Sequence, residues 1–328
     1  MPQSKKMKIA VITGGDNAEQ EISVKSANTI IKHLDKEKYE SYLLNYHFGK
    51  IKDEVTGFAV DLNTFRMELM DGTLRFDLVI LFLHGTPAED GKLQAYLELM
   101  DMPYVGCDSF TSALTFDKQA CKRYLHGQKI PMAKSVLLHK TNPDLESLSS
   151  LSGNSLFVKP NKNGSSYGVS MVNADAEYTK AIHKAFEFDE EVIVEEYLKG
   201  REFSNGVYLG VDGIKVMPVT EIIPHKDFFD YEAKYKNESD EVTPADLSKG
   251  LTLKCQAQSR QLYASLQCKG MVRFDYILVG EEFYFLEVNT IPGFSEQSLF
   301  PQQIKANGMT ISGVLDEIIE ETIMRYKA

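Results

Sequence analysis

Residues 273–289 read RFDYILVGEEFYFLEVN, and this stretch says most about the fold. Two runs of alternating polar and apolar side chains flank a turn of sequence GEE, which predicts a β-hairpin. If those three residues form the loop, Asp275 lies opposite Glu287, and Arg273 lies opposite Asn289. Alternation then places all four polar side chains on one face of the hairpin. The other face is expected to carry the apolar side chains of Phe274, Tyr276, Leu286 and Val288.

The polar face of this hairpin has two interpretations. Carboxylate and amide oxygens without a softer ligand suit Mg²⁺ that is held jointly with phosphate groups. A solvated sheet face with cross-strand ion pairs is the alternative. The next residues, TIPGFSEQSLFP at 290–301, favour the cation site. A Pro-Gly turn there would bring backbone N–H groups and hydroxyls beside the polar face.

The composition is that of a globular protein with more than one domain. The chain has 328 residues, 43% of them hydrophobic and 25% charged, and a formal net charge of −11. This charge disfavours nucleic acids and membranes as partners, because binding to polyanions needs clustered Lys and Arg. The first apolar run, IAVIT, is too short for a signal sequence or a membrane span, so we expect a cytoplasmic protein. The four cysteines lack the spacing of a zinc site and are expected to be buried thiols.

Strand and helix patterns alternate in the first third of the chain. Continuous apolar strands separated by amphipathic helices predict a parallel sheet with helices on its faces. The expected strands are 8–13, 39–46 and 75–85, and the expected helices are 21–34 and 92–100.

The rest of the chain reads as mixed α+β, and the fold class is therefore α/β followed by α+β. Strands are expected at 133–140, 155–160 and 192–198, with a second hairpin over 202–223. Helices are expected at 109–127, 175–188, 245–268 and 311–326, and a long surface loop at 227–242. The expected domains are 1–106, 107–194 and 195–328.

Three further spots carry candidate chemistry. The glycine-rich stretch FVKPNKNGSSYGVS at 157–170 can lay backbone N–H groups over phosphates while Lys159 supplies a charge, or it can be an exposed turn. It is neither a Walker A loop nor a dinucleotide fingerprint. Glu19 and His84 follow predicted parallel strands, where open α/β sheets bind ligands. The alternatives are a glutamate favoured by the helix dipole and a histidine bonded to backbone.

Eight motifs, taken in chain order, resemble the D-alanine:D-alanine ligases of the ATP-grasp superfamily, and the resemblance covers essentially the whole chain. RFD, LEVN and the glycine-rich loop are shared across ATP-grasp enzymes, whereas the motifs at 14–23, 84–91 and 230–235 are particular to this group. The motifs are GGDNAEQEIS, HGTPAEDG, FDK, VKPNKNGSSYGV, EEYLKGREF, FFDYEAKY, RFD and LEVNTIPGFSEQS.

The resemblance implies an N-terminal Rossmann-like domain followed by a two-lobed ATP-grasp fold that closes on ATP. It also implies a reaction in which the carboxylate of one D-alanine takes the γ-phosphate of ATP, and the amine of a second D-alanine attacks the acyl phosphate. The dipeptide serves peptidoglycan precursor synthesis. Two alternatives stay open: a D-alanine:D-serine or D-alanine:D-lactate ligase, and a non-catalytic ATP-grasp binding protein. Tyr235 favours an amine nucleophile, because depsipeptide-forming relatives commonly have phenylalanine there.

The resemblance also assigns roles to residues that would hold the nucleotide and the metal. ATP phosphates would contact Lys118, Lys159 and Lys234. Adenine would be read by Glu195 and Leu198 and stacked on Tyr197, and the ribose would bond Glu202. Two Mg²⁺, or Mn²⁺, would be held by Asp275, Glu287 and Asn289.

The substrate and catalytic roles follow in the same way. Glu19 would meet the ammonium group of the first D-alanine and connect through Ser165 to Tyr235, and His84 would lie near that substrate. Arg273 and the N–H of Gly293 would stabilise the oxyanion. The carboxylate of the second substrate would be received by Ser298 and Leu299. The resemblance further implies a homodimer.

Overall fold

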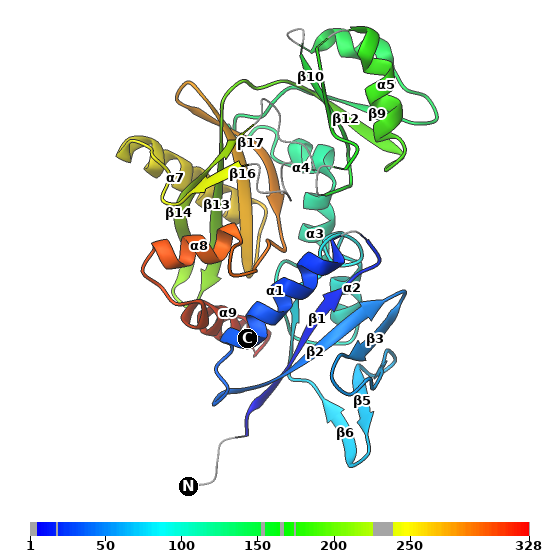
Figure 1. Cartoon of the computed structure of the whole chain (residues 1–328), viewed down its shortest axis with the longest axis vertical. Helices are drawn as coiled ribbons and strands as arrows, with labels where there is room; N and C mark the ends of the chain where they lie inside the picture. Colours follow the sequence, from blue (N-terminus) through cyan, green and yellow to red (C-terminus); the bar gives the residue numbers. More distant parts are fainter. Residues whose placement is uncertain are drawn as a thin grey trace.

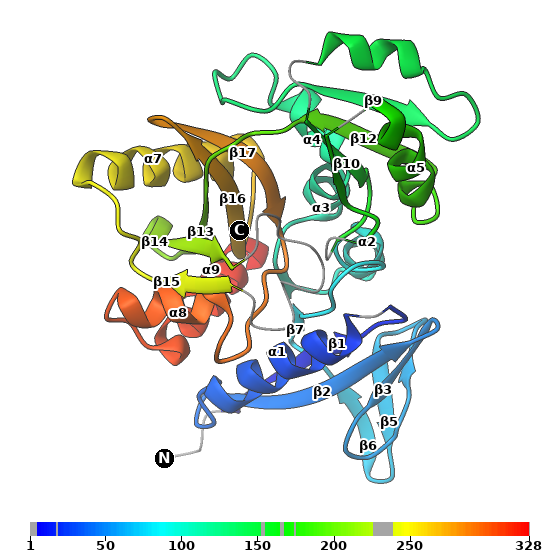
Figure 2. The ribbon, with the colours of Figure 1, turned by 45° about the horizontal axis from the view of Figure 1, so that its top comes forward.

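The structure is a computed structural model of the chain, and it describes residues 5–17, 19–151, 155–164, 167–173, 175–225 and 239–327. The described part is built on three larger sheets and one small one. Figure 1 shows the N-terminal sheet at the bottom, the sheet of the C-terminal third at the left and a third sheet at the upper right. Helices α3 and α4 run between the N-terminal sheet and this third sheet, as Figure 2 also shows.

The N-terminal sheet has the strand order β3-β2-β1-β7-β8. Four of its strands pair in parallel, which confirms the predicted parallel sheet, but β3 pairs antiparallel with β2 and was not predicted. Helices α1 (Gln20–His33) and α2 (Lys92–Leu99) form where they are expected. The strand predicted at 75–85 is regular only over its middle. The strands are β1 (Met7–Gly14), β2 (Tyr39–His47), β3 (Lys50–Asp53), β7 (Leu78–Leu81) and β8 (Tyr104–Val105).

A small antiparallel sheet follows β3 and was missed by the sequence analysis. It consists of β4 (Val60–Asp61), β5 (Arg66–Leu69) and β6 (Gly72–Arg75). Strands of two to four residues are too short for a clear alternation of polar and apolar side chains.

Residues 109–127 form two helices, not the single helix predicted. α3 (Ser109–Phe116) ends at Asp117, and α4 (Lys118–Tyr124) begins directly after it. The carboxylate of Asp117 accepts a hydrogen bond from Ala120 N at 2.8 Å. Aspartate is a preferred N-cap residue because its oxygen satisfies a free N–H of the first turn. The break therefore places Lys118 at the start of a new helix.

The third sheet has the order β11-β10-β12-β9 and is antiparallel throughout. We call residues 135–196 the central lobe. β10 pairs with β11, and the glycine-rich stretch lies between them in the chain. Its elements are β9 (Ser135–His139), the 3-10 helix η1 (Leu145–Ser150), β10 (Leu156–Pro160), β11 (Ser170–Val172), α5 (Asp175–Ala185) and β12 (Glu191–Glu196).

The C-terminal sheet has the order β15-β14-β13-β16-β17 and contains both predicted hairpins. β15 (Ser239–Val242) corrects the expected loop at 227–242, because its last four residues pair with β14 as a polar edge strand. Helix α8 (Leu299–Ala306) was not predicted. The remaining elements are β13 (Arg201–Gly210), β14 (Gly213–Pro224), α7 (Lys249–Ser265), β16 (Met271–Val279), β17 (Glu282–Asn289) and α9 (Ile311–Lys327).

Buried apolar side chains gather in three clusters. The first joins the N-terminal sheet to α8 and α9, and includes Ile12, Phe300 and Val314. The second lies between the C-terminal sheet and helices α4 and α7. The third, with Val158 and Val194, is confined to the central lobe. The N-terminal and C-terminal parts therefore share a core, whereas the central lobe has its own.

Two sequence-based expectations concern thiols and membranes. All four cysteines, Cys107, Cys121, Cys255 and Cys268, are buried and free, as predicted. None of the helices in the described part combines the length and the apolar character that spanning a bilayer requires.

Candidate active site

Two adjoining cavities lie between the central lobe, the C-terminal sheet and the N-terminal strand ends. The larger has a volume of about 370 Å³ and the smaller of about 280 Å³. They share part of their walls, so they lie directly side by side. The shared lining residues are Lys118, Asn163, Gly164, Glu202, Ile222, Leu286 and Glu287.

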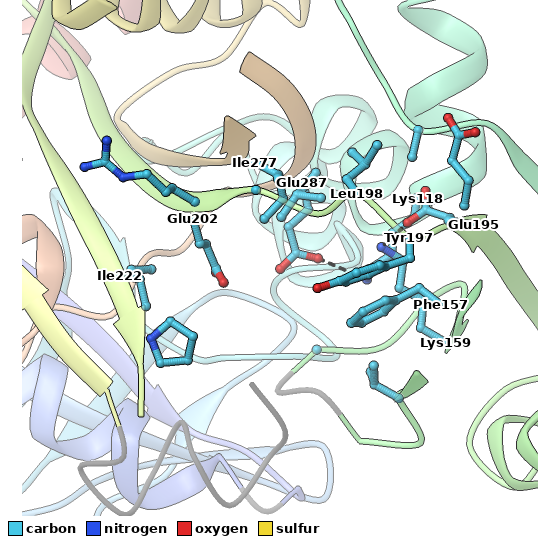
Figure 3. Close-up of a pocket in the computed structure, with 18 of the residues that line it drawn as sticks. Lys118, Phe157, Lys159, Glu195, Tyr197, Leu198, Glu202, Ile222, Ile277 and Glu287 are labelled. Carbon is cyan, nitrogen blue, oxygen red and sulfur yellow. Dashed lines mark ion pairs between the residues drawn. The ribbon is translucent and has the colours of Figure 1, made fainter. Parts of the chain in front are cut away.

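The larger cavity gathers the residues that the sequence analysis assigned to ATP. Figure 3 shows them around one space, with the rings of Tyr197 and Phe157 side by side. These two rings are nearly parallel, with centroids 6.1 Å apart, and both residues line the cavity. The assigned residues that line it are Lys118, Lys159, Glu195, Tyr197, Leu198 and Glu202. Their individual roles stay predictions, and Lys234 lies outside the described residues.

Glu195 is the centre of a buried charge cluster at this cavity. Its Oε2 lies 2.7 Å from Lys159 Nζ, and its Oε1 lies 2.5 Å from Lys122 Nζ. Burial opposes ionisation of Glu195, but the two lysines outweigh it and lower its pKa to about 2. Burial likewise disfavours the charge on Lys159, yet Glu195 and Glu287 raise the pKa of that lysine. The carboxylate therefore stays ionised and can only accept hydrogen bonds.

Lys118 lies where the two cavities meet. It is the first residue of α4, and its Nζ donates a hydrogen bond to Asn163 O at 2.7 Å. The same Nζ lies 3.6 Å from Glu287 Oε2, the contact between these two side chains marked in Figure 3. This ammonium group is thus placed between the glycine-rich loop and the acidic face of the C-terminal sheet.

The hairpin at 273–289 has the predicted pairing but a different loop. Asp275 pairs with Glu287 and Arg273 pairs with Asn289, as expected. The turn, however, has two residues, because Val279 pairs with Glu282, and the register then shifts by one residue beyond Tyr276. This irregularity leaves Leu286 without a partner across the ladder. Leu286 lines both cavities, so the prediction that it lies on the opposite, apolar face is wrong.

Asp275 accepts four hydrogen bonds on this face from residues that the structure describes. Arg273 donates to both of its oxygens, from Nε to Oδ1 at 3.0 Å and from Nη2 to Oδ2 at 2.8 Å. Ser204 Oγ donates to Oδ1 at 2.7 Å, and Asn289 Nδ2 donates to Oδ2 at 3.0 Å. Burial opposes the charge of Arg273, but Asp275 outweighs it and raises the pKa of the guanidinium. Charge pairing and hydrogen bonds together fix the geometry of this corner.

The donor set on this face fits a hard cation. Asp275, Glu287 and Asn289 offer carboxylate and amide oxygens in the wall of the smaller cavity, next to the larger cavity that Lys118 and Lys159 line. Within the described ranges, no group of three or more His, Cys, Asp or Glu side chains could hold a metal ion. A cation here would therefore need further oxygens, and phosphate groups are the usual source for Mg²⁺.

The smaller cavity contains the residues assigned to the first amino acid. Glu19 is the N-cap residue of α1, and a β-carbon added at Gly164 would lie 3.6 Å from its Oε2. The glycine-rich loop therefore comes close to the N-terminal helix. His84 is buried, and its Nε2 has no hydrogen-bond partner among the residues that the structure describes. A buried, unpaired ring nitrogen in a cavity wall suits contact with a polar substrate.

The segment after the hairpin forms the far wall of the smaller cavity. Gly293 lies close to Ser298, since a β-carbon there would be 3.2 Å from Ser298 Oγ. Ser298 is the N-cap residue of α8 and makes no side-chain cap hydrogen bond, and Leu299 begins the helix. The N-terminus of a helix presents N–H groups and a positive dipole, which favour a carboxylate.

Several residues of the site escaped the sequence analysis. Asn161 is fully buried and connects the end of β10 to the start of α4. Lys122 lies one helical turn after Lys118, and that spacing is the signal that could have drawn attention to it. Ser204 pairs with Asp275 across β13 and β16, and it is a fully buried polar residue. Ser165 and Tyr235, which were assigned to the substrate network, lie outside the described residues.

Comparisons with known proteins agree with this arrangement. Residues 50–107 match the family described as D-ala D-ala ligase N-terminus, and residues 128–320 match D-ala D-ala ligase C-terminus. A D-alanine–D-alanine ligase of Flavobacterium johnsoniae is 41% identical over 316 residues, which cover 95% of this chain and 98% of the relative. One from Parabacteroides distasonis is 39% identical and covers 98% of this chain and 99% of the relative.

Solved structures are similar over nearly the whole chain. A D-Ala:D-Ser ligase from Enterococcus faecalis has a TM-score of 0.88 at 32% identity, covering 97% of this chain and 100% of that one. A D-alanine–D-alanine ligase from Bacillus anthracis complexed with ATP has a TM-score of 0.80 at 29% identity, covering 98% and 99%.

The three-sheet architecture and the site between its lobes are those of an ATP-grasp enzyme. Within that class, the two matched family models and a relative with 41% sequence identity show to which family of ATP-grasp enzymes the chain belongs. The chain belongs to the D-alanine–D-alanine ligase family.

Proposed function

We propose that the chain joins two molecules of D-alanine to D-alanyl-D-alanine at the expense of ATP, for the synthesis of peptidoglycan precursors. The shared wall of the two cavities carries this proposal. Lys118, Gly164, Glu202 and Glu287 line both, so a nucleotide in the larger cavity would have its phosphates beside a substrate in the smaller one. Phosphoryl transfer needs this positioning and charge neutralisation more than a protein nucleophile.

In the first step, a carboxylate oxygen of one D-alanine attacks the γ-phosphorus of ATP. The bond to the β-phosphate oxygen breaks, ADP leaves, and an acyl phosphate forms. Lys118 and Lys159 supply positive charge at the cavity that would hold the phosphates. Glu19 would pair with the ammonium group of this D-alanine, and His84 Nε2 would contact a polar group of the same D-alanine.

In the second step, the amine of the other D-alanine attacks the carbonyl carbon of the acyl phosphate. The C–N bond forms, the C–O bond to phosphate breaks, and the proton of the amine passes to the departing phosphate. Charge develops on the carbonyl oxygen, where Arg273 and the N–H of Gly293 would stabilise it. Ser298 and the N-terminus of α8 would hold the carboxylate of the attacking amino acid.

We further propose that Asp275, Glu287 and Asn289 hold two Mg²⁺ when ATP is bound. The ions would neutralise charge on the phosphates during transfer. Arg273, Ser204 and Asn289 donate hydrogen bonds to the oxygens of Asp275, so this carboxylate is held in a fixed position at the proposed cation site. A cytoplasmic location and a homodimer also remain predictions.

The test is phosphate release by the purified protein with ATP and Mg²⁺. Release is expected only when D-alanine is added, with D-alanyl-D-alanine as the product in mass spectrometry. Asp275→Asn is expected to abolish release while ADP binding persists, since the variant keeps the shape of the side chain but loses its charge. Release without D-alanine, or no release at all, would contradict the proposal.

The second substrate is tested by competition. One of the similar solved structures is a D-Ala:D-Ser ligase, so D-serine is included as the alternative second substrate. A mixture of D-alanine, D-serine and D-lactate is expected to give mainly D-alanyl-D-alanine. A dominant D-alanyl-D-serine product would identify the other specificity while leaving the ATP chemistry intact.

A further inference from the structure

Lys122 is a buried lysine that contacts the nucleotide site without lining it. It lies on α4, its side chain is 9% exposed, and it donates hydrogen bonds to Glu195 Oε1 at 2.5 Å and to Ala133 O at 2.6 Å. Glu195 and Ala133 belong to the wall of the larger cavity, whereas Lys122 lies behind it. Burying an ammonium group is costly unless it is paired, so these contacts hold it in one position.

Lys122 and Lys159 share a single carboxylate. Lys159 approaches Glu195 Oε2 from β10, and Lys122 approaches Oε1 from α4, so each lysine has an oxygen of its own. Only Lys159 also lines the cavity. The two lysines and Glu195 together leave one positive charge in excess beside the space for the phosphates.

We propose that Lys122 is a positioning residue for ATP: it remains paired with Glu195 when the phosphates draw Lys159 away, so that this carboxylate keeps a counterion. The inference rests on the proposed function only in taking ATP as the nucleotide. Removing one partner of a buried ion pair leaves an uncompensated charge and is strongly unfavourable. With Lys122 present, Lys159 can leave Glu195 without that cost. Without Lys122, Lys159 becomes the sole counterion and is held back from the phosphates.

The direction of two pKa shifts agrees with this division of roles. Burial disfavours the charge on Lys159, but Glu195 and Glu287 outweigh it and raise its pKa. Burial dominates at Lys122 and lowers its pKa, although Glu195 acts in the opposite direction. Burial therefore outweighs the nearby carboxylates at Lys122, whereas Glu195 and Glu287 together outweigh burial at Lys159.

The test compares Lys122→Met with the wild type by calorimetry, using ATP and adenosine as separate ligands in the presence of Mg²⁺. The affinity for ATP is expected to fall about tenfold or more, because binding must now break the remaining buried pair. Adenosine has no phosphates to draw Lys159 away, so its affinity is expected to fall several times less than that of ATP, even though Glu195 is also assigned to adenine. Lys122→Arg keeps the positive charge and is expected to restore most of the affinity for ATP.

Lys140→Met is the matched control. Lys140 also pairs with a glutamate of the central lobe, Glu190, at 3.2 Å, but both side chains are exposed and neither lines the cavity. This variant is expected to bind ATP as the wild type does. Unchanged ATP affinity in Lys122→Met, or equal losses for ATP and adenosine, would overturn the proposal.

A double variant covers the case in which Lys122→Met does not fold. Once Glu195 is changed to Gln, no carboxylate needs a counterion, so Lys122→Met is expected to have no further effect on ATP affinity in that background. A further loss of about tenfold in Glu195→Gln/Lys122→Met relative to Glu195→Gln would refute the role of Lys122 through Glu195.

Binding and turnover separate this inference from the proposed function. If the wild type binds ATP but releases no phosphate with D-alanine, the proposed reaction fails, and the Lys122 comparison still stands. If D-alanine-dependent release occurs and Lys122→Met binds ATP normally, the inference fails alone.

Discussion

At the scale of single residues, Glu195 links the charge of the site to the stability of the fold. Its pKa is about 2 in the folded protein against 4.5 as its ordinary value, because Lys159 and Lys122 outweigh the cost of burial. A lowered folded pKa gives stability that is fully present above pH 4.5 and is lost as the pH falls toward 2. Since one pKa unit is worth about 1.4 kcal/mol, the effect is on the order of 3 kcal/mol.

Glu195→Gln is therefore expected to lose less free energy of unfolding than the wild type between pH 6 and pH 3. Urea titrations at a series of pH values measure this difference. Glu190→Gln is the control, because Glu190 is an exposed neighbour that pairs with Lys140. If the free energy of unfolding of both variants depends on pH as that of the wild type does, ionisation of Glu195 does not stabilise the fold.

Single residues also show where prediction from sequence ends. The pairing of Asp275 with Glu287 was predictable, because alternation along two strands fixes which side chains share a face. The role of Leu286 was not, since it depends on one extra residue in β17 that restores this pairing after a two-residue turn. Lys122 follows Lys118 by one helical turn and therefore lies on the same side of α4. Its partner Glu195 is distant in the chain, and only the tertiary structure brings the two together.

At the scale of elements, Asn161 connects the glycine-rich hairpin to helix α4. Its side-chain oxygen accepts from Gln119 N at 2.9 Å, and its Nδ2 donates to Asp117 Oδ1 at 2.8 Å and to Glu191 Oε2 at 3.1 Å. Its backbone O accepts from Lys118 N at 3.3 Å. One buried amide thus fixes the strand that carries Lys159 against the helix that begins with Lys118.

Asn161→Ala is expected to destabilise the protein by about 1–3 kcal/mol, because the variant leaves buried partners unsatisfied. It should also weaken ATP binding more than adenosine binding, since Lys118 and Lys159, which we propose to contact the phosphates, lose a fixed position. Thermal unfolding and calorimetry provide the two measurements. Asn173→Ala serves as control, because Asn173 is exposed and accepts one hydrogen bond from Ser155. If Asn161→Ala were as stable as Asn173→Ala, the proposed role of Asn161 would be contradicted.

Helices and strands were predictable where a single sequence pattern dominated, such as a long apolar run or two alternating runs around a short turn. Long apolar strands and the two hairpins of the C-terminal sheet form as expected. The single helix at 109–127 was wrong because an aspartate inside a helical pattern acts as a cap and not as an interior residue. β15 was missed because its sequence, SDEV, carries the charges typical of a loop, and only pairing with β14 makes it a strand.

At the scale of the whole molecule, the three buried clusters of apolar side chains set the central lobe apart from the rest of the protein. The N-terminal sheet shares buried side chains with α8 and α9, whereas the buried cluster of the central lobe contains residues of that lobe alone. A part with its own small core can open at a lower free energy than the whole protein. The glycine-rich hairpin belongs to this part, and its residues Asn163, Gly164 and Tyr167 line the larger cavity.

Hydrogen exchange is expected to reflect this division. Without ligand, the amides of β10 and β12 should exchange faster than those of β1 and β13. ATP with Mg²⁺ should slow exchange in the central lobe in particular, since the nucleotide would contact both it and the C-terminal sheet. Equal protection in all three sheets, or an effect of ATP spread evenly over the chain, would show that the central lobe does not open as a separate unit.

The wall shared by the two cavities has a consequence for inhibitors. Because Lys118, Gly164 and Glu287 line both spaces, one molecule that tethers an adenosine to a D-alanine mimic could fill both at once. Its second half would bind at the high effective concentration set by a short tether, and the loss of translational freedom would be incurred once instead of twice. Such a compound would require both pockets in their mutual arrangement, so proteins that have only a nucleotide pocket would bind it through one half.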